Sequence, residues 1–87
     1  MRILVDACVR KSIYLRLKKY LEKFGHEVYY ARELPPLPDK ALVEYYKPDV
    51  VVTRDKTFPF KNKVVIPKNK TDFSIVIKRI FTGEKLP

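Results

Sequence analysis

Two short runs of branched apolar residues, each followed by an aspartate, constrain this fold most strongly. Residues 3–5 (Ile-Leu-Val) precede Asp6, and residues 50–53 (Val-Val-Val-Thr) are followed two positions later by Asp55. Runs of this length and composition are typical of strands buried on both faces, as in a parallel sheet. If the two strands are neighbours, both carboxylates lie at the carboxyl edge of the sheet, where open α/β folds bind their ligands.

Helical and strand patterns alternate along the rest of the chain. Apolar residues at helical spacing predict a helix over residues 11–24 that Gly25 ends, and a strand over residues 27–31. Prolines at three of positions 35–38 make a stiff loop. The remaining predicted elements are a helix over residues 39–46, strands over 49–53 and 63–66, and a last helix from 71 or 72 to 81, with Gly83 after it.

The two longer helices are each expected to bury one apolar face. In the first helix this face comprises Ile13, Leu17, Tyr20, Leu21 and Phe24. In the last helix it comprises Phe73, Val76, Ile77, Ile80 and Phe81.

Strands separated by helices imply right-handed crossovers and a mainly parallel sheet with helices on both faces. We therefore predict one domain over residues 1–87, an α/β fold with three layers (α/β/α) and a mainly parallel four-stranded sheet. A domain of this length buries only roughly 60–65% of its unfolded surface, so a homodimer would stabilise it.

The composition of the chain indicates its cellular compartment and the kind of molecule that it binds. The chain carries 19 Lys and Arg against 10 Asp and Glu, a net charge of +9 that favours polyanions such as nucleic acid. The single cysteine, Cys8, is expected to be a small buried side chain and fits a reducing compartment. No apolar run approaches the ~20 residues of a membrane span, and no secretion signal follows Met1, so we expect a cytoplasmic protein. The two glycines exclude a glycine-rich phosphate loop.

The predicted topology sorts the acids between the two edges of the sheet. Asp6 and Asp55 share the carboxyl edge, and Glu33 and Asp39 can join them from the loop after the second strand. Asp49 precedes its strand and belongs to the opposite edge. Mg²⁺ and Mn²⁺ prefer oxygen ligands, and a cation relieves the repulsion between neighbouring carboxylates. The pattern therefore predicts a divalent metal site of the kind that metal-dependent nucleases use.

Each of these acids also has an ordinary structural role open to it. Asp39 precedes Lys-Ala-Leu as a helix N-cap would. Asp6 could accept hydrogen bonds from the backbone amides of the following turn, and Asp55 could cap a turn before Phe58. Glu33 could be solvated loop surface. Asp72 could join the site only if the last helix starts over the same edge.

Basic residues follow the same strand ends as the acids. The predicted nucleic-acid-binding residues are Arg10, Lys11, Arg54, Lys56 and Lys68, and Lys61, Lys63 and Lys70 lie nearby in sequence. A positive rim around an acidic centre suits a phosphate backbone whose cleavage needs a metal. The alternative is a solvated surface that keeps the protein soluble.

In this order and spacing, the motifs resemble the short PIN-like family, which is related to the PIN-domain ribonucleases of toxin–antitoxin systems. The resemblance rests on residues 3–6, residues 21–28, Asp39 at a helix start and residues 50–58. It implies a PIN-like fold in which Asp6, Asp39 and Asp55 are the metal-binding, catalytic acids of a Mg²⁺- or Mn²⁺-dependent site that cleaves RNA. It also implies a homodimer and, in toxin systems, an antitoxin protein as partner.

The chain departs from the family pattern at the positions next to two of these acids. Ala7 and Cys8 stand where members commonly have an acid and an Asn, and Thr57 stands where they have a second Asp. The alternative function is therefore a non-catalytic nucleic-acid-binding PIN-like module with an incomplete acid set. Residues 48–52 also resemble the phosphoacceptor strand of a receiver domain, but the chain is too short for that fold and lacks its paired acid.

Overall fold

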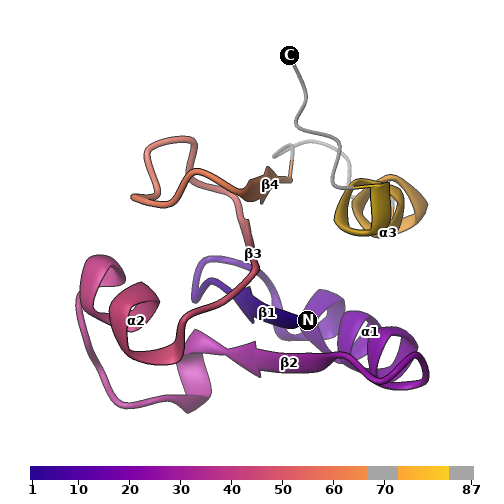
Figure 1. Cartoon of the computed structure of the whole chain (residues 1–87), viewed down its shortest axis with the longest axis horizontal. Helices are drawn as coiled ribbons and strands as arrows, with labels where there is room; N and C mark the ends of the chain where they lie inside the picture. Colours follow the sequence, from indigo (N-terminus) through magenta and orange to yellow (C-terminus); the bar gives the residue numbers. More distant parts are fainter. Residues whose placement is uncertain (67–72, 83–87) are drawn as a thin grey trace.

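The structure is a computed structural model that describes residues 1–66 and 73–82, and within them it has a four-stranded, all-parallel sheet (Figure 1). The elements in chain order are β1 (Arg2–Val5), α1 (Lys11–Glu22), β2 (Glu27–Tyr30), the 3-10 turn η1 (Ala31–Glu33), α2 (Asp39–Tyr46), β3 (Val50–Thr53), β4 (Lys63–Val65) and α3 (Phe73–Thr82). The predicted α/β class and order of elements are confirmed, and the sheet is entirely rather than mainly parallel. Lys68, Lys70, Asp72 and Gly83 lie outside the described residues.

The strand order β2-β1-β3-β4 makes β1 and β3 the central pair. Ile3 is in register with Val28 on one side and with Val50 on the other, so β1 pairs along its length with both neighbours. The chain leaves β1 toward β2 and later returns past β1 to β3, which reverses the winding direction between β1 and β3. Open α/β folds commonly bind their ligands at the carboxyl ends of the strands that flank such a switch point.

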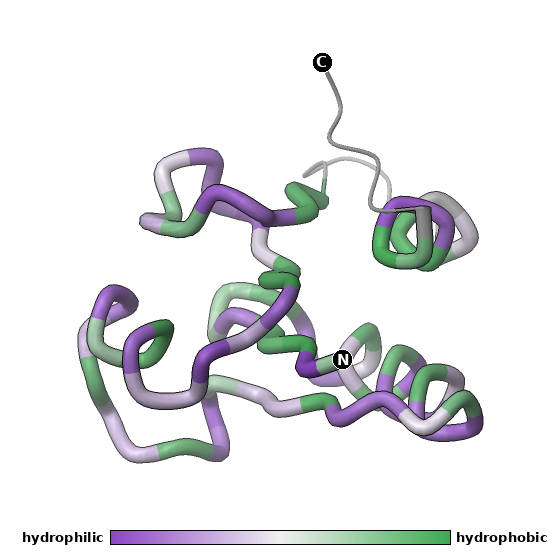
Figure 2. Tube along the Cα trace, in the orientation of Figure 1, coloured by the Kyte–Doolittle hydropathy of each residue, from purple (hydrophilic) through white to green (hydrophobic). Residues whose placement is uncertain are grey.

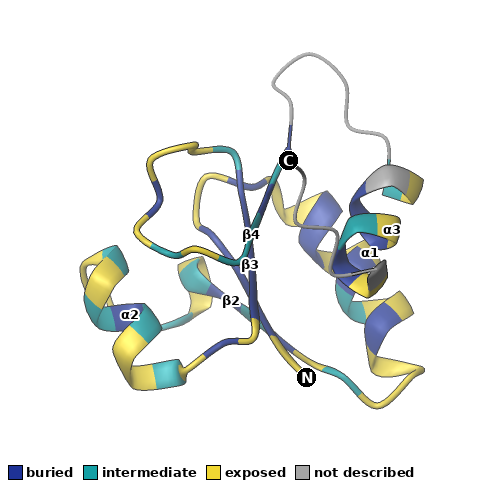
Figure 3. Cartoon of the chain, turned by 45° about the horizontal axis from the view of Figure 1, so that its top comes forward, coloured by how far each residue is buried: buried dark blue, intermediate teal, exposed yellow. Residues whose placement is uncertain are grey.

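Helices cover both faces of the sheet and make three layers (Figure 3). Alternate residues of the strands divide between two cores. Ile3 and Val5 pack in the core that contains the buried residues of α1 and α3, whereas Leu4 packs with Leu42 of α2. Polar and apolar residues alternate around α1, as expected of a helix with one buried face (Figure 2). No helix among the described residues is long and apolar enough to cross a membrane.

The buried face of α1 differs from the predicted one. Leu17 and Leu21 are buried as expected, but Tyr14 is buried in place of Tyr20 and Phe24, which are exposed. Tyr14 stacks on Tyr30 of β2 with ring centroids 4.3 Å apart, which turns this face of α1 toward β2. Phe24 lies beyond the last helical residue, in the turn that ends at Gly25 with φ of +80°.

The apolar face of α3 is confirmed in its central part. Val76, Ile77 and Ile80 are buried in the α1/α3 core, and Phe73 is partly buried against it. Phe81 is exposed, so the prediction was wrong at this position.

Two leucines on α1 give a matched test of this packing. Leu17 is fully buried in the α1/α3 core, whereas Leu15 is half exposed two residues earlier. We expect Leu17→Ala to lower the free energy of unfolding by about 2–5 kcal/mol, because it removes buried methyl groups and leaves a cavity. Leu15→Ala should change it by less than about 0.5 kcal/mol. Urea denaturation measures both, and equal losses would contradict the orientation of α1.

Candidate functional site

Asp6 lies directly after β1, at the carboxyl edge of the sheet. Its backbone N–H donates to the carbonyl oxygen of Val52 at 2.8 Å, which continues the pairing of β1 with β3 beyond the strand. The residue is only 7% exposed. Its Oδ1 accepts the N–H of Ala7 at 2.7 Å, and its Oδ2 accepts the hydroxyl of Thr53 at 2.7 Å. The structural role predicted for Asp6 in the turn is therefore present, together with a link to β3.

Thr53 connects the two strand-end acids. Its side chain is fully buried at the end of β3. The hydroxyl donates to Oδ2 of Asp6 and accepts the backbone N–H of Asp55 at 3.0 Å. Sequence reasoning did not single out Thr53, although a hydroxyl at the end of an all-valine strand is a signal for such a role.

Asp55 lies in the exposed loop after β3. Its Oδ1 accepts both the N–H of Thr57, at 2.8 Å, and the Thr57 hydroxyl, at 2.6 Å. These two hydrogen bonds, the hydroxyl first, hold the pKa of Asp55 below its ordinary value, and the charge of Lys63 adds to their effect. The predicted turn-capping role of Asp55 is confirmed. Its Oδ2 accepts no hydrogen bond from the residues that the structure describes.

Asp39 is the first residue of α2. The prediction that it caps this helix was wrong, because Pro38 occupies the N-cap position and no side-chain hydrogen bond caps the helix. Burial raises the pKa of Asp39, and the negative charges of Asp6 and Asp55 raise it further. Asp39 therefore lies within electrostatic range of both Asp6 and Asp55.

The described carboxylates do not form a three-ligand site for a fully dehydrated cation. Across residues 1–66 and 73–82, no three His, Cys, Asp or Glu side chains are close enough to bind one ion directly. Mg²⁺ commonly keeps several of its waters and needs only one or two carboxylates. Asp6 Oδ1 and Asp55 Oδ2 both retain acceptor capacity. These two residues would hold the ion, with Asp39 acting through its charge or through water.

Cys8 is exposed at this edge, so the prediction of a buried side chain was wrong. Its Sγ donates to Oδ2 of Asp6 at 3.2 Å and accepts the N–H of Arg54 at 3.3 Å. The turn after β1 explains the difference. It is closed by the N–H of Val9, which donates to the carbonyl oxygen of Asp6, and it is Val9 that enters the core.

The two other acids considered from the sequence lie elsewhere. Glu33 belongs to η1 and accepts the hydroxyl of Tyr14 at 3.2 Å, which ties it to α1. Asp49 lies before β3, as predicted, and its Oδ2 accepts the N–H of Arg2 at 2.7 Å.

Only part of the predicted basic rim is exposed at the carboxyl edge. Arg10, Lys11 and Lys56 are exposed near the carboxyl ends of β1 and β3. Lys63 instead donates to the carbonyl oxygens of Phe58 and Phe60, so its ammonium braces the loop before β4. Arg54, also predicted to bind nucleic acid, is partly buried and has an interaction partner. Lys68, the last of the predicted nucleic-acid-binding residues, lies outside the described part of the chain.

Arg32 is a cation of this edge that sequence reasoning missed. Its Nε donates to the carbonyl oxygen of Ala7 at 2.6 Å, which places the guanidinium next to the turn that follows Asp6. Its position just after β2 was the available signal, because the same reasoning had selected Arg10 after β1.

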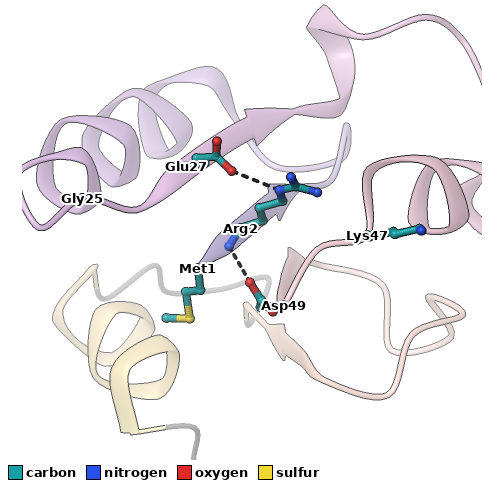
Figure 4. Close-up of a pocket in the computed structure, with 6 residues that line it drawn as sticks. All are labelled: Met1, Arg2, Gly25, Glu27, Lys47 and Asp49. Atoms are coloured by element: carbon teal, nitrogen blue, oxygen red, sulfur yellow. Dashed lines mark hydrogen bonds and ion pairs between the residues drawn. The ribbon is translucent and has the colours of Figure 1, made fainter.

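A cavity of about 460 Å³ opens at the opposite, amino edge of the sheet (Figure 4). Its lining mixes both charge signs. Glu27 forms an ion pair with Arg2 at 3.0 Å, and Asp49 also points toward Arg2, whereas Lys47 extends away from it. This cavity is far from the predicted acids in the topology, and we do not assign it to them.

Comparison of the chain with known proteins found no match. No protein-family model matches the chain, and no curated protein or solved structure is significantly similar to it.

The hydroxyl of Thr53 can be removed with little change in shape by Thr53→Val. The variant leaves the Asp6 carboxylate and the Asp55 N–H each without one buried partner, so we expect a loss of about 1–3 kcal/mol in the free energy of unfolding. Thr57→Val, which removes an exposed hydroxyl bound to Asp55, is the matched control and should cost less. Urea denaturation gives both values, and an unchanged midpoint for Thr53→Val would refute the bridge.

The raised pKa of Asp39 gives a second test. The folded protein holds this proton more tightly than the unfolded chain, so Asp39 favours folding below its ordinary pKa of 3.8. This contribution is lost as the pH rises through the folded-state pKa. In a carboxyl NMR titration, Asp6→Asn and Asp55→Asn should each lower the pKa of Asp39, whereas Asp49→Asn at the other edge should not. Three identical titration curves would show that the acids do not interact.

Proposed function

We propose that this protein is a metal-dependent ribonuclease of PIN type that cleaves RNA phosphodiester bonds with Mg²⁺ or Mn²⁺. The observation that carries the proposal is the joint placement of three carboxylates at the β1/β3 switch point. Asp6 and Asp55 are linked through Thr53, and both raise the pKa of Asp39. The resemblance to PIN-like proteins supports the same three residues as the catalytic set.

The three acids have different roles in the proposed reaction. Asp6 and Asp55 would hold the hydrated cation, and the hydrogen bonds from Thr53 and Thr57 fix the orientation of their carboxylates. The cation, when bound, stabilises charge on the phosphate and makes a bound water more acidic. Asp39, whose pKa is raised by burial, would accept a proton from the attacking water.

The cations at the carboxyl edge would bind the RNA backbone. Arg10, Lys11 and Lys56 are exposed, and Arg32 is held at Ala7. Because these contacts are to phosphates, they position the RNA without reading its sequence. The proposed setting is the cytoplasm, and the resemblance adds a homodimer and, in a toxin system, an antitoxin partner to the proposal.

A second candidate function is a nucleic-acid-binding module without catalysis. Two observations favour this second function. The described residues contain no cluster of three side chains that could bind one metal ion directly. Ala7 and Thr57 also stand where PIN-like proteins commonly have acidic residues. In that case the basic rim binds RNA, and the carboxylates serve only in the turns.

RNA cleavage with and without metal separates the two functions. With Mn²⁺ and a labelled single-stranded RNA, we expect Asp6→Asn and Asp55→Asn to slow cleavage by about 100-fold or more, because each removes part of a cation site worth several kcal/mol of transition-state stabilisation. Asp39→Asn should also reduce the rate, and EDTA should abolish it.

Asp49→Asn is the matched control, because it changes a hydrogen-bonded aspartate at the opposite edge and should leave the rate unchanged. Equal rates for the wild type, Asp6→Asn and Asp55→Asn would contradict the proposal. Binding that weakens steeply with salt, without cleavage by the wild type, would establish the second function.

A further inference from the structure

The helices α1 and α3 lie on the same face of the sheet (Figure 3), and aromatic side chains of both helices contact one another there. We call this cluster the aromatic face; it comprises Tyr20, Phe24, His26, Phe73 and Phe81. Tyr20 lies at its centre, with ring centroids 5.3 Å from Phe24 and 6.2 Å from Phe81. Tyr20, Phe24 and Phe81 are 37%, 59% and 42% exposed, so the α1/α3 core does not account for them.

Cations of α1 border the aromatic face. Arg16, Lys19 and Lys23 are spaced at three and four residues, which puts them on the side of the helix that also carries Tyr20. The Arg16 guanidinium lies 4.3 Å from the ring centroid of Phe73. These four residues and Phe73 line a hollow of about 280 Å³, and no acid is among its lining residues.

The aromatic face is separate from the carboxylates of the candidate site. The helix α1 starts with Lys11 near the carboxyl end of β1 and runs back for 12 residues, roughly 18 Å, toward the amino edge. At that far end, His26 Nδ1 is 3.0 Å from the amino group of Met1. A strand of nucleic acid that ran from the aromatic face along α1 would reach Lys11 and the acids.

The residues of the aromatic face favour one class of binding partner over others. In a two-fold dimer through this face, the cations Arg16, Lys19 and Lys23 of the two copies would face and repel one another. An amphipathic helix from another protein binds in an extended hydrophobic groove, whereas this hollow is lined by five residues, of which three are cations. Exposed rings beside cations instead match single-stranded nucleic acid, whose bases stack on aromatic side chains while its phosphates pair with the cations.

We propose that the aromatic face, with Arg16, Lys19 and Lys23, is a second binding site for single-stranded RNA that needs neither metal nor the carboxylates. The proposal rests on the proposed function only in naming RNA rather than DNA. Binding at this site positions the strand beside α1 so that its continuation reaches the carboxyl edge.

Binding to a fluorescein-labelled oligouridylate in EDTA tests this site apart from cleavage. Phe24→Ala should weaken binding by at least about five-fold, because one stacked base contributes roughly 1 kcal/mol or more. Leu15→Ala is the control, since Leu15 is 50% exposed on α1 but is not part of the aromatic face. Lys23→Gln should reduce the slope of log affinity against log salt by about 0.7, whereas Lys40→Gln on α2 should not change it. Unchanged binding by Phe24→Ala, with the variant shown to be folded by urea denaturation, would overturn the proposal.

NMR titrations of the same protein in EDTA locate the ligand. Oligouridylate should shift the ring and amide signals of Tyr20, Phe24 and Phe81, and an abasic oligomer of equal charge should shift the rings less. Shifts confined to residues 6–11 and 54–57 would overturn the second site but leave the proposed ribonuclease intact. Equal shifts with poly-glutamate would assign the aromatic face to acidic proteins and also overturn the proposal.

Discussion

The parallel pairing of β1 with β3 is the constraint on which the rest of the structure depends. Val5 and Val52 are in register and both fully buried, and the next residue, Asp6, continues the same hydrogen-bonding pattern. A slip of one residue would exchange the two faces of β1 and carry its apolar side chains to the wrong core. The packing that stabilises the fold therefore also sets the positions of Asp6 and Thr53. For this reason the geometry of the candidate site follows from the core rather than from the loops alone.

The three acids of the carboxyl edge have different electrostatic surroundings in a strongly basic chain. Hydrogen bonds from Thr57 lower the pKa of Asp55, which keeps this carboxylate ionised, whereas burial and the charges of Asp6 and Asp55 raise the pKa of Asp39. Among the described residues, no buried side-chain nitrogen or oxygen lacks a hydrogen-bond partner. Asp6 and Asp55 are joined through their hydrogen bonds to Thr53, and the proposed cation would relieve the repulsion that remains.

The sequence was sufficient for the features that depend on strand direction and hydrophobic period. The carboxyl-edge placement of Asp6 and Asp55 needs only that two strands run parallel as neighbours. The details that were missed depend on tertiary contacts. Both Tyr14 and Tyr20 fit a helical spacing with Leu17, and stacking on β2 selects Tyr14. The bridging role of Thr53 arises only because the side chain of an acid on the neighbouring strand reaches it. No periodicity in the sequence contains such information.

The most direct test of the central claim is the paramagnetic effect of Mn²⁺ on the backbone amide signals of the full chain. If the carboxylates at the β1/β3 switch point form one cation site, signals from residues 6, 39 and 55 should broaden first, and those from residues 27 and 49 at the amino edge should persist. The Asp6→Asn/Asp55→Asn double variant should lose this selective broadening while its spectrum otherwise remains that of a folded protein. Absence of localised broadening at millimolar Mn²⁺, or broadening centred on the amino edge, would contradict the account.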